Sequence, residues 1–264
     1  METTAIFTRT LTTSTVSAFD LVHDEYSKGL KFVSNGDGTC FVSGIGTCTD
    51  TDIKIPPVYN GEKVTSIGRG AFEGRMNIKS ITLPEGVELI EGWAFHDCFN
   101  LRGIVIPESV TSMGRGVFSG CNRLKNITVP DGVTRINESM FDNCMSLTSI
   151  AIPNSVTRID SSAFRYCTRL ENITIPDSVT RVSCDAFEGC MSLKSVMLPK
   201  GVELMVDCAG MYSVTHVICD AFEVRRNIKS VMFPKDVELM VDCTGTGITR
   251  FKIVTIGNNI SSKF

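Results

Sequence analysis

The sequence predicts an α/β solenoid, a stack of 23-residue coils with a parallel β-sheet along one face. Prolines and phenylalanines carry this prediction, because each recurs every 23 residues through the middle of the chain. The positions are Pro84, Pro107, Pro130, Pro153, Pro176 and Pro199, and Phe72, Phe95, Phe118, Phe141, Phe164 and Phe187. Such a period is typical of solenoids, in which each unit is too small to bury its own apolar face and packs against its neighbours.

Each coil is expected to begin with a short β-strand. In the segment "LTSIAIPNSVTRIDSSAFRYC", Ile150 and Ile152 alternate with smaller side chains, which is the pattern of a strand with one buried face. Pro153 is expected to end this strand in a tight turn, because proline fixes φ and has no amide hydrogen to donate.

After that turn the chain is expected to return across the core and form a single helical or 3₁₀ turn on the far side. Asp160 is a candidate N-cap, and Ala163 and Cys167 follow with the spacing of one helix face. Phe164 is expected to fill the space between strand and turn. Strands separated by a crossover of this length can pair in parallel with the equivalent strands of the next coil.

The period divides the chain into four parts. They are a leader expected to be poorly ordered (1–28), an N-terminal β cap (29–67), the regular repeats (68–205), and irregular or duplicated repeats with a C-terminal tail (206–264). In the last part, "KSVMLPKGVELMVDC" returns almost unchanged as "KSVMFPKDVELMVDC", and Pro234 follows Pro199 by 35 residues. We interpret this as a duplication that carries extra residues.

Composition excludes several classes of function. A chain of 264 residues that is 42% hydrophobic can bury a large core, and a net charge of −3 gives no reason to expect nucleic acid or an anionic membrane as partner. No apolar run is long enough to span a membrane, so we expect no membrane insertion. The first residues, "METTAIFTRTLTTSTVSAF", are interrupted by Thr and Ser, and we expect no export signal there.

Eleven cysteines raise the question of disulfides or zinc. Five of them recur once per coil, and no CxxC pair is present to hold a metal. These five are Cys98, Cys121, Cys144, Cys167 and Cys190. Because equivalent residues of stacked coils lie ~4.8 Å apart, beyond the reach of a disulfide, we expect them to be reduced and buried. We expect neither a metal nor another cofactor.

The pattern L-x-x-I-x-I-P-x-S-V-T-x-I-x-x-x-A-F-x-x-C resembles the leucine-rich repeats of the BspA-like, or Treponema pallidum-type, family over roughly residues 30–243. The resemblance implies a right-handed, horseshoe-like leucine-rich-repeat solenoid with its parallel sheet on the concave side. Many relatives are bacterial or protist surface proteins implicated in adhesion. The resemblance therefore implies a cell-surface or secreted protein, whereas the missing export signal favours a cytoplasmic one, and both locations stay open.

A binding surface is predicted on the concave strands, where side chains between the buried isoleucines face outward. Its residues are Lys79, Thr82, Arg102, Lys125, Asn126, Thr128, Thr148, Ser149, Glu171, Asn172, Thr174, Lys194 and Met197. They form a polar groove with a basic edge that suits a protein loop, an acidic peptide or a glycan. The alternative is that a tightly stacked sheet tolerates small polar residues, and that the lysines keep its edge soluble and the protein monomeric.

Other polar positions have competing interpretations. Arg135, Arg158 and Arg181 recur at one position of the coil, as an anion site or, more simply, as a solvated face. Trp93 is either a contact anchor or packed against a neighbouring unit.

Few residues suit catalysis, since the three histidines do not occupy equivalent positions of the repeat. His96 next to a cysteine suggests an activated thiol, but Cys98 is expected to be buried and inert.

Three functions follow from these observations. The first is a non-enzymatic module that recognises a protein or glycan through the concave sheet, in the manner of an adhesin. The second is an intracellular scaffold or regulatory repeat protein. The third and most remote is a thiol-dependent enzyme.

Overall fold

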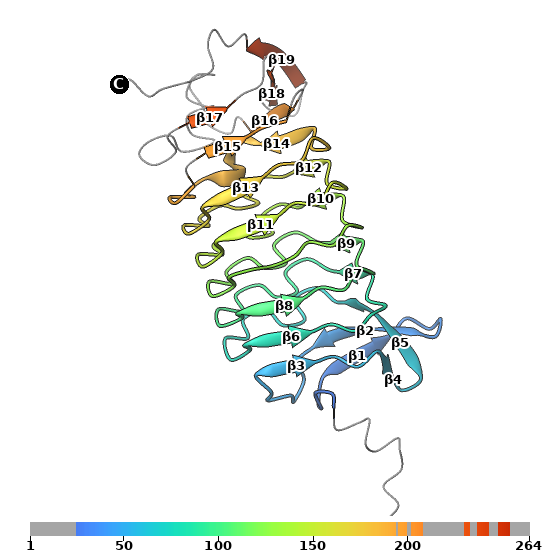
Figure 1. Ribbon diagram of the computed structural model, residues 1–264. Helices are drawn as coiled ribbons and strands as arrows, with labels where there is room; N and C mark the ends of the chain where they lie inside the picture. The colour runs from blue at the N-terminus through green and yellow to red at the C-terminus, as the bar shows by residue number, and fades with distance from the viewer. Residues whose placement is uncertain are drawn as a thin grey trace, which may run out of the picture.

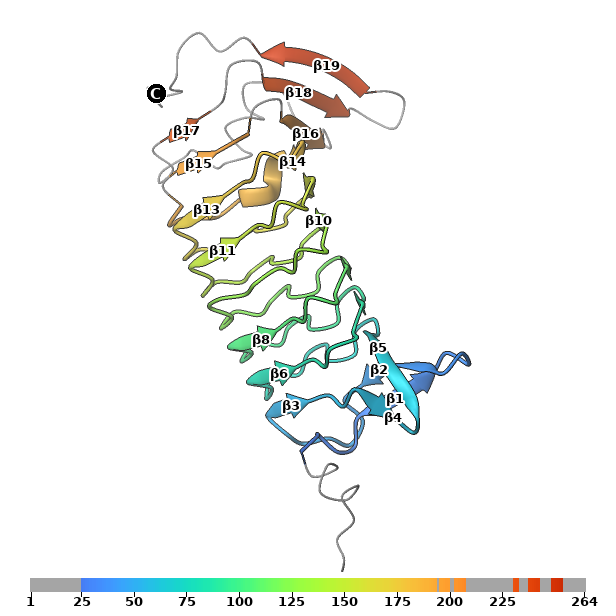
Figure 2. The same ribbon diagram turned by 45° about the vertical axis from the view of Figure 1, so that its right-hand side comes forward.

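The computed structural model describes residues 25–193, 195–199, 202–207, 230–232, 237–242 and 248–253, and its regular part is a stack of coils (Figure 1). Equivalent residues 23 apart pair in parallel from one coil to the next, as Ser149 does with Asn172. The predicted solenoid of 23-residue coils with parallel strands is therefore confirmed. A view turned by 45° shows the same coils lying one upon another along a single axis (Figure 2).

The predicted strands form one side of the stack, which we call the first ladder. The strands are β3 (Asp52–Lys54), β6 (Ser80–Thr82), β8 (Gly103–Val105), β11 (Ser149–Ala151), β13 (Asn172–Thr174), β15 (Ser195–Met197) and β17 (Ser230–Met232). Thr128 joins it through a single bridge to Ala151. From β3 to β13 the central residue of each strand, such as Ile150, is buried while its two neighbours face outward.

A second parallel ladder, which sequence reasoning did not predict, runs along another side of the stack. It comprises β2 (Thr39–Gly44), β5 (Glu62–Ile67), β7 (Leu89–Ile90), β9 (Ser112–Met113), β10 (Arg135–Ile136), β12 (Arg158–Ile159), β14 (Arg181–Ser183), β16 (Glu203–Asp207) and β18 (Val237–Asp242). From β7 onward it is formed by the segments that return after the repeated prolines. Only two or three residues pair in most coils, too few for an alternating sequence pattern to predict a strand.

Three further strands flank these ladders in antiparallel pairs. β1 (Lys31–Ser34) pairs with β2, β4 (Val58–Tyr59) pairs with β5, and β19 (Ile248–Ile253) pairs with β18.

The predicted N-terminal cap, residues 29–67, contains β1, β2, β4 and β5, and its role as a cap stays a prediction. Residues 1–24 of the predicted leader and most of 206–264 lie outside the described residues. The described strands of the two duplicated segments pair with each other at an offset of 35 residues, as Ser195 does with Ser230.

The third side of the stack, the turn face, consists mostly of consecutive β-turns, where a single helical or 3₁₀ turn was expected. In one coil the N–H of Ala163 bonds to Asp160 O at 3.2 Å and the N–H of Arg165 bonds to Ser162 O at 3.1 Å. Ser162 has φ 54°, and Tyr166 has φ 55°, which no right-handed helix accommodates. Among the described residues, a 3₁₀ helix forms in one coil, at η1 (Cys184–Phe187).

The residues between these turns bond to the next coil, which explains why no α-helix forms in these coils. The N–H of Phe164 donates to Ala186 O at 2.8 Å and that of Tyr166 to Glu188 O at 2.7 Å. Alternate amides thus point along the stack, whereas a helix directs every amide along its own axis. Asp160 does not cap a helix as predicted; it is buried and accepts bonds from arginine side chains.

The six repeated phenylalanines form the centre of the core. Each is fully buried, and neighbouring rings stack with centroids 5.4 to 5.7 Å apart. In the coil of Phe164 the other buried side chains are Leu147, Ile150, Ile152, Val156, Ile159, Ala163 and Cys167. The predicted position of Phe164 between strand and turn is confirmed. Each stacked pair adds ~0.5–1.5 kcal/mol beyond the burial of its surface.

Small polar residues of the repeat also tie neighbouring coils together. The hydroxyl of Ser155 donates to Val133 O at 2.7 Å, and that of Ser178 donates to Val156 O at 2.8 Å. The tight turn predicted after each strand is confirmed, since the N–H of Val156 bonds to Pro153 O at 3.0 Å. The serine that recurs in the P-x-S-V motif thus forms a hydrogen bond to the neighbouring coil.

Replacing Phe164 by alanine should lower the free energy of unfolding by ~3–5 kcal/mol, because a fully buried ring leaves a cavity between two stacked neighbours. Denaturant unfolding followed by circular dichroism measures the loss. Thr174→Ala, at an exposed position of the next coil, is the control and should change the stability by less than ~0.5 kcal/mol. Equal effects of the two substitutions would contradict the stacked core.

Candidate functional site

The structure brings most of the predicted binding residues onto one exposed surface. We define the strand face as the outward side chains of the first ladder together with the residue that precedes each strand. Exposed members are Lys79, Thr82, Arg102, Lys125, Asn126, Thr128, Thr148, Ser149, Glu171, Asn172 and Thr174. Lys194 lies outside the described residues, and Met197 lies on β15 with only its backbone described.

Parallel pairing fixes the spacing of this face. Thr82 pairs with Val105, and Ala151 pairs with both Thr128 and Thr174, so the outward columns continue by pairing within β3–β8 and again from Thr128 to β13. The residues before the strands are held in the same way, since the N–H of Arg102 donates to Lys79 O at 2.9 Å. The strand face is therefore a rigid surface whose side chains repeat at the ~4.8 Å spacing of paired strands.

An apolar row beside the strand face was missed by the sequence reasoning. Met76, Phe99, Met145 and Met191 recur at one position of the coil, three residues before the rim, and expose 63%, 42%, 40% and 57% of their surface. Asn122 and Thr168 occupy the same position in the other two coils. The 23-residue period contained this signal, but periodicity alone does not tell an exposed methionine from a buried one.

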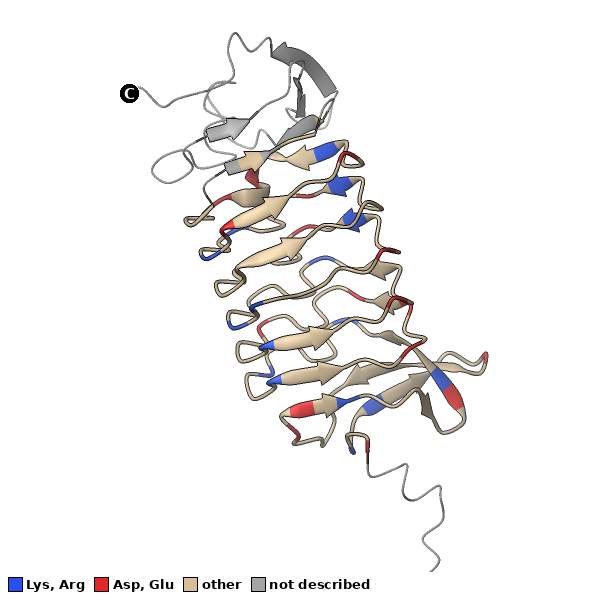
Figure 3. Cartoon of the chain, in the orientation of Figure 1, with Lys and Arg blue, Asp and Glu red and all other residues tan. Residues whose placement is uncertain are grey.

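Cations line the edge between the apolar row and the strands. Lys79, Arg102 and Lys125 precede successive strands, and Figure 3 shows basic positions along the edge where these strands begin. The guanidinium of Arg123 lies 5.8 Å from the centre of the Phe99 ring. Apolar and basic groups thus meet along this edge.

Two members of the arginine column on the second ladder are held by a buried carboxylate. Arg135 and Arg158 both donate through Nε to Asp160, whose side chain is 5% exposed. Two cations shared by one buried anion leave little field to attract a ligand. The geometry therefore favours a structural role for Arg135 and Arg158 over an anion site.

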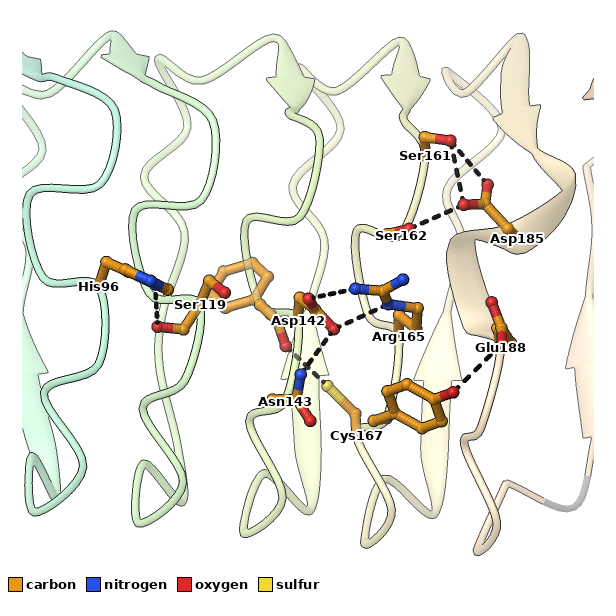
Figure 4. A network of polar contacts seen from close by, with 12 residues as sticks. His96, Ser119, Asp142, Asn143, Ser161, Ser162, Arg165, Cys167, Asp185 and Glu188 are labelled. Carbon is orange, nitrogen blue, oxygen red and sulfur yellow. Dashed lines mark hydrogen bonds and ion pairs between the residues drawn. The ribbon is translucent and has the colours of Figure 1, made fainter. Parts of the chain in front are cut away.

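A second polar network ties coils together on the turn face (Figure 4). Arg165 forms two bonds to the nearly buried carboxylate of Asp142, at 3.1 and 2.8 Å, and these bonds raise the pKa of the Arg165 guanidinium. Ser161 and Ser162 both donate to Asp185 in the next coil. These groups satisfy one another, so the network stabilises the stack and leaves no activated nucleophile.

The repeated cysteines are buried and free, as predicted. Each thiol donates to the carbonyl of a phenylalanine in the preceding coil, as Cys98 Sγ does to Phe72 O at 3.1 Å. Burial raises the pKa of Cys98 to about 12. His96 directs Nδ1 to Ser119 O at 3.1 Å instead. The geometry therefore opposes an imidazole-activated thiol at Cys98.

Trp93 is half-buried and lies on the turn face with φ 63°. Its ring rests on the next coil at Gly116, where an added Cβ would lie 2.1 Å from the indole. Tyr166 repeats the arrangement, with φ 55° and Gly189 beneath its ring. Trp93 and Tyr166 occupy two different positions of the coil. At each, a large side chain in the left-handed region lies over a glycine at the equivalent position of the next coil.

Among the residues described, no helix has both the length and the apolar character needed to cross a membrane. Over the same residues, no three His, Cys, Asp or Glu side chains gather closely enough to hold a metal ion.

Known proteins resemble this chain in repeat and in fold. A profile of the family described as "BspA type Leucine rich repeat region (6 copies)" matches residues 47–171 and 157–263. A solved T. pallidum leucine-rich repeat protein is similar at 26% identity and a TM-score of 0.65, over 75% of this chain and 92% of that chain. No curated protein matches.

Two further solved structures share the fold alone. A leucine-rich cell surface protein from Faecalibacterium prausnitzii is 23% identical with a TM-score of 0.51, over 68% of this chain and 69% of that chain. A leucine-rich repeat protein from Eubacterium ventriosum is 23% identical with a TM-score of 0.57, over 65% of this chain and 46% of that chain.

The cysteine ladder should resist alkylation in the folded protein. With its pKa raised from 9.0 to about 12, Cys98 carries roughly a thousandfold less thiolate at pH 8 than an ordinary thiol. Iodoacetamide at pH 8, followed by peptide mapping, should label the half-buried Cys48 and spare Cys98 until denaturant is added. Labelling of Cys98 at the rate of Cys48 in the native protein would contradict its burial.

Proposed function

Because the chain belongs to the family of BspA-type leucine-rich repeats, we propose that it is a non-enzymatic module that captures a protein partner on the strand face. The observation that carries this proposal is the stacking of exposed side chains on that face. Outward side chains from successive coils form exposed columns on a backbone fixed by hydrogen bonds between coils. A rigid surface loses little conformational entropy on binding, which favours affinity.

The chemistry of the edge indicates what such a partner presents. Basic Lys79, Arg102 and Lys125 stand beside the exposed Phe99 and Met145. Methionine and aromatic side chains are enriched at protein interfaces, and methionine adapts to partners of different shape. A protein segment that combines carboxylates with apolar side chains complements both rows. This combination favours a protein over a neutral glycan as the ligand.

The buried thiols support a binding function over a thiol-dependent enzyme. Each repeated cysteine is enclosed by the core and donates to a backbone carbonyl. A buried thiol of raised pKa is a poor nucleophile.

Adhesin and intracellular scaffold differ in compartment and not in geometry. Both use the same surface, and fractionation of the native host separates them. Protein found in the cytosol alone would remove the adhesin interpretation, whereas labelling of intact cells by an impermeant reagent would remove the scaffold interpretation.

Two substitutions test the strand face. Lys125→Glu should weaken partner binding about 3–10-fold and slow association at low salt, because it places an anion at the basic edge. Asn172→Trp should weaken binding further, because an indole at an exposed strand position blocks contact with the neighbouring columns. Peptides selected from a displayed library against the wild-type protein provide the ligand, and surface plasmon resonance measures the affinities.

The matched control is Lys63→Glu, a charge reversal at an exposed position of β5 away from the strand face. It should leave binding of the selected peptides unchanged. The proposal fails if the peptides bind all three variants as they bind the wild type, or if the selected peptides show no excess of acidic residues.

A further inference from the structure

Trp93 has a backbone conformation that a smaller residue would adopt at lower cost. It is the single tryptophan of the chain, and its φ of 63° lies in the left-handed region. The equivalent residues of the next three coils are Gly116, Ser139 and Ser162, with φ of 60°, 53° and 54°. Glycine adopts this region freely, whereas a bulky residue there is strained. Strained positions cluster at functional sites.

The indole is held in place without being enclosed. Its ring lies against Gly116, meets His96 edge-on with ring centroids 5.0 Å apart, and has the guanidinium of Arg115 5.4 Å from its centroid. Trp93 nevertheless remains half-buried. Complete burial of the ring in the core therefore does not compensate for the backbone strain.

An open pocket of about 360 Å³ lies beside the indole, at the corner where β7 and β9 lead into the turn face. Its lining includes Arg69, Leu89, Glu91 and Arg115 as well as Trp93. The carboxylate of Glu91 accepts a bond from the backbone N–H of Arg69 at 3.1 Å, which fixes its position. The pocket thus presents an aromatic surface, two cations and one oriented acceptor within a volume typical of small-molecule sites.

We propose that this pocket binds a pyranose sugar that carries a carboxylate, such as a uronic acid. The C–H groups on one face of a sugar ring carry partial positive charge and pack on the negative face of an indole. Arg69 supplies a cation for the carboxylate, as does Arg115, whose Nη1 also lies 3.9 Å from Glu138 Oε2. Glu91 accepts a bond from a ring hydroxyl. A planar aromatic acid without a hydroxyl group has no donor for Glu91. The site shares no residue with the strand face and is independent of the function proposed for that face.

Titration with glucuronate tests the site directly. Because Trp93 is the only tryptophan, its fluorescence reports occupancy of the pocket without a label. Glucuronate should change the emission in a saturable way with a dissociation constant of roughly 1–10 mM, as suits a ligand of this size. Glucose, which has the same ring without the carboxylate, should bind at least about 5-fold more weakly. Equal responses to the two sugars, or no response to glucuronate, would overturn the proposal.

Two arginine variants test whether the sugar binds in this pocket or through nonspecific attraction to positive charge. Arg115→Ala should weaken glucuronate binding at least about 5-fold, measured by saturation-transfer NMR on the sugar. Arg123→Ala, which removes an arginine that lies over Phe99, is the matched control and should bind as the wild type does. Equal loss in both variants, or no loss in Arg115→Ala, would contradict the assignment.

Trp93→Ser tests the argument from strain. Serine is the residue that two other coils use at this position, so the substitution should raise the melting temperature by about 2–4 °C while abolishing the NMR signal of bound glucuronate. An unchanged or lower melting temperature would mean that the indole stabilises the coil, and retained sugar binding would mean that the ligand lies elsewhere. Either result would overturn the proposal.

Discussion

Hydrogen bonding between coils is the constraint on which the rest of this structure depends. On each side of the stack, backbone N–H groups of one coil donate to carbonyls of a neighbour, as Phe141 does to Ala163 on the turn face and Thr157 to Thr134 near the second ladder. A backbone group that is buried without a partner costs free energy, so each coil has to match the path of the next. Residues 23 apart therefore lie side by side, and every position of the repeat becomes a column.

The columns pointing inward and those pointing outward obey different rules. Inward, a column of identical residues packs well because flat rings stack, as the phenylalanines do, and each cysteine thiol reaches a carbonyl one coil away. Outward, a column of identical charges would repel itself. On the turn face and the second ladder, carboxylates among the arginines reduce this repulsion, as with Asp142 and Arg165 or Asp160 and Arg158. Charge on these two sides is thus used to hold coils together.

The strand face and the Trp93 pocket differ from those surfaces because they keep exposed cations and apolar groups beside the bonds that join their coils, such as the bond from the Arg69 N–H to Glu91. The side chains of Lys79, Lys125 and Asn172 are exposed on a backbone that cannot easily move, and the apolar row of Met76, Phe99, Met145 and Met191 adds contact area beside them. At the pocket, Gly116 leaves room for an indole that the other coils do not carry. Recognition on such a scaffold comes from variation at outward positions, while the repeat itself preserves the fold.

The sequence by itself determined the coil length, the buried columns and the outward strand positions, because a period of 23 with strict Pro and Phe positions leaves one way to stack. It could not show that the far side forms β-turns, since the spacing of Ala163 and Cys167 also fits a helix; the choice depends on amides that bond to the next coil. It could not assign Asp160 to two arginines or expose the methionine row, and it could not place Trp93 over Gly116. Each of these depends on contacts between residues of neighbouring coils, and only the tertiary structure decides where those side chains meet.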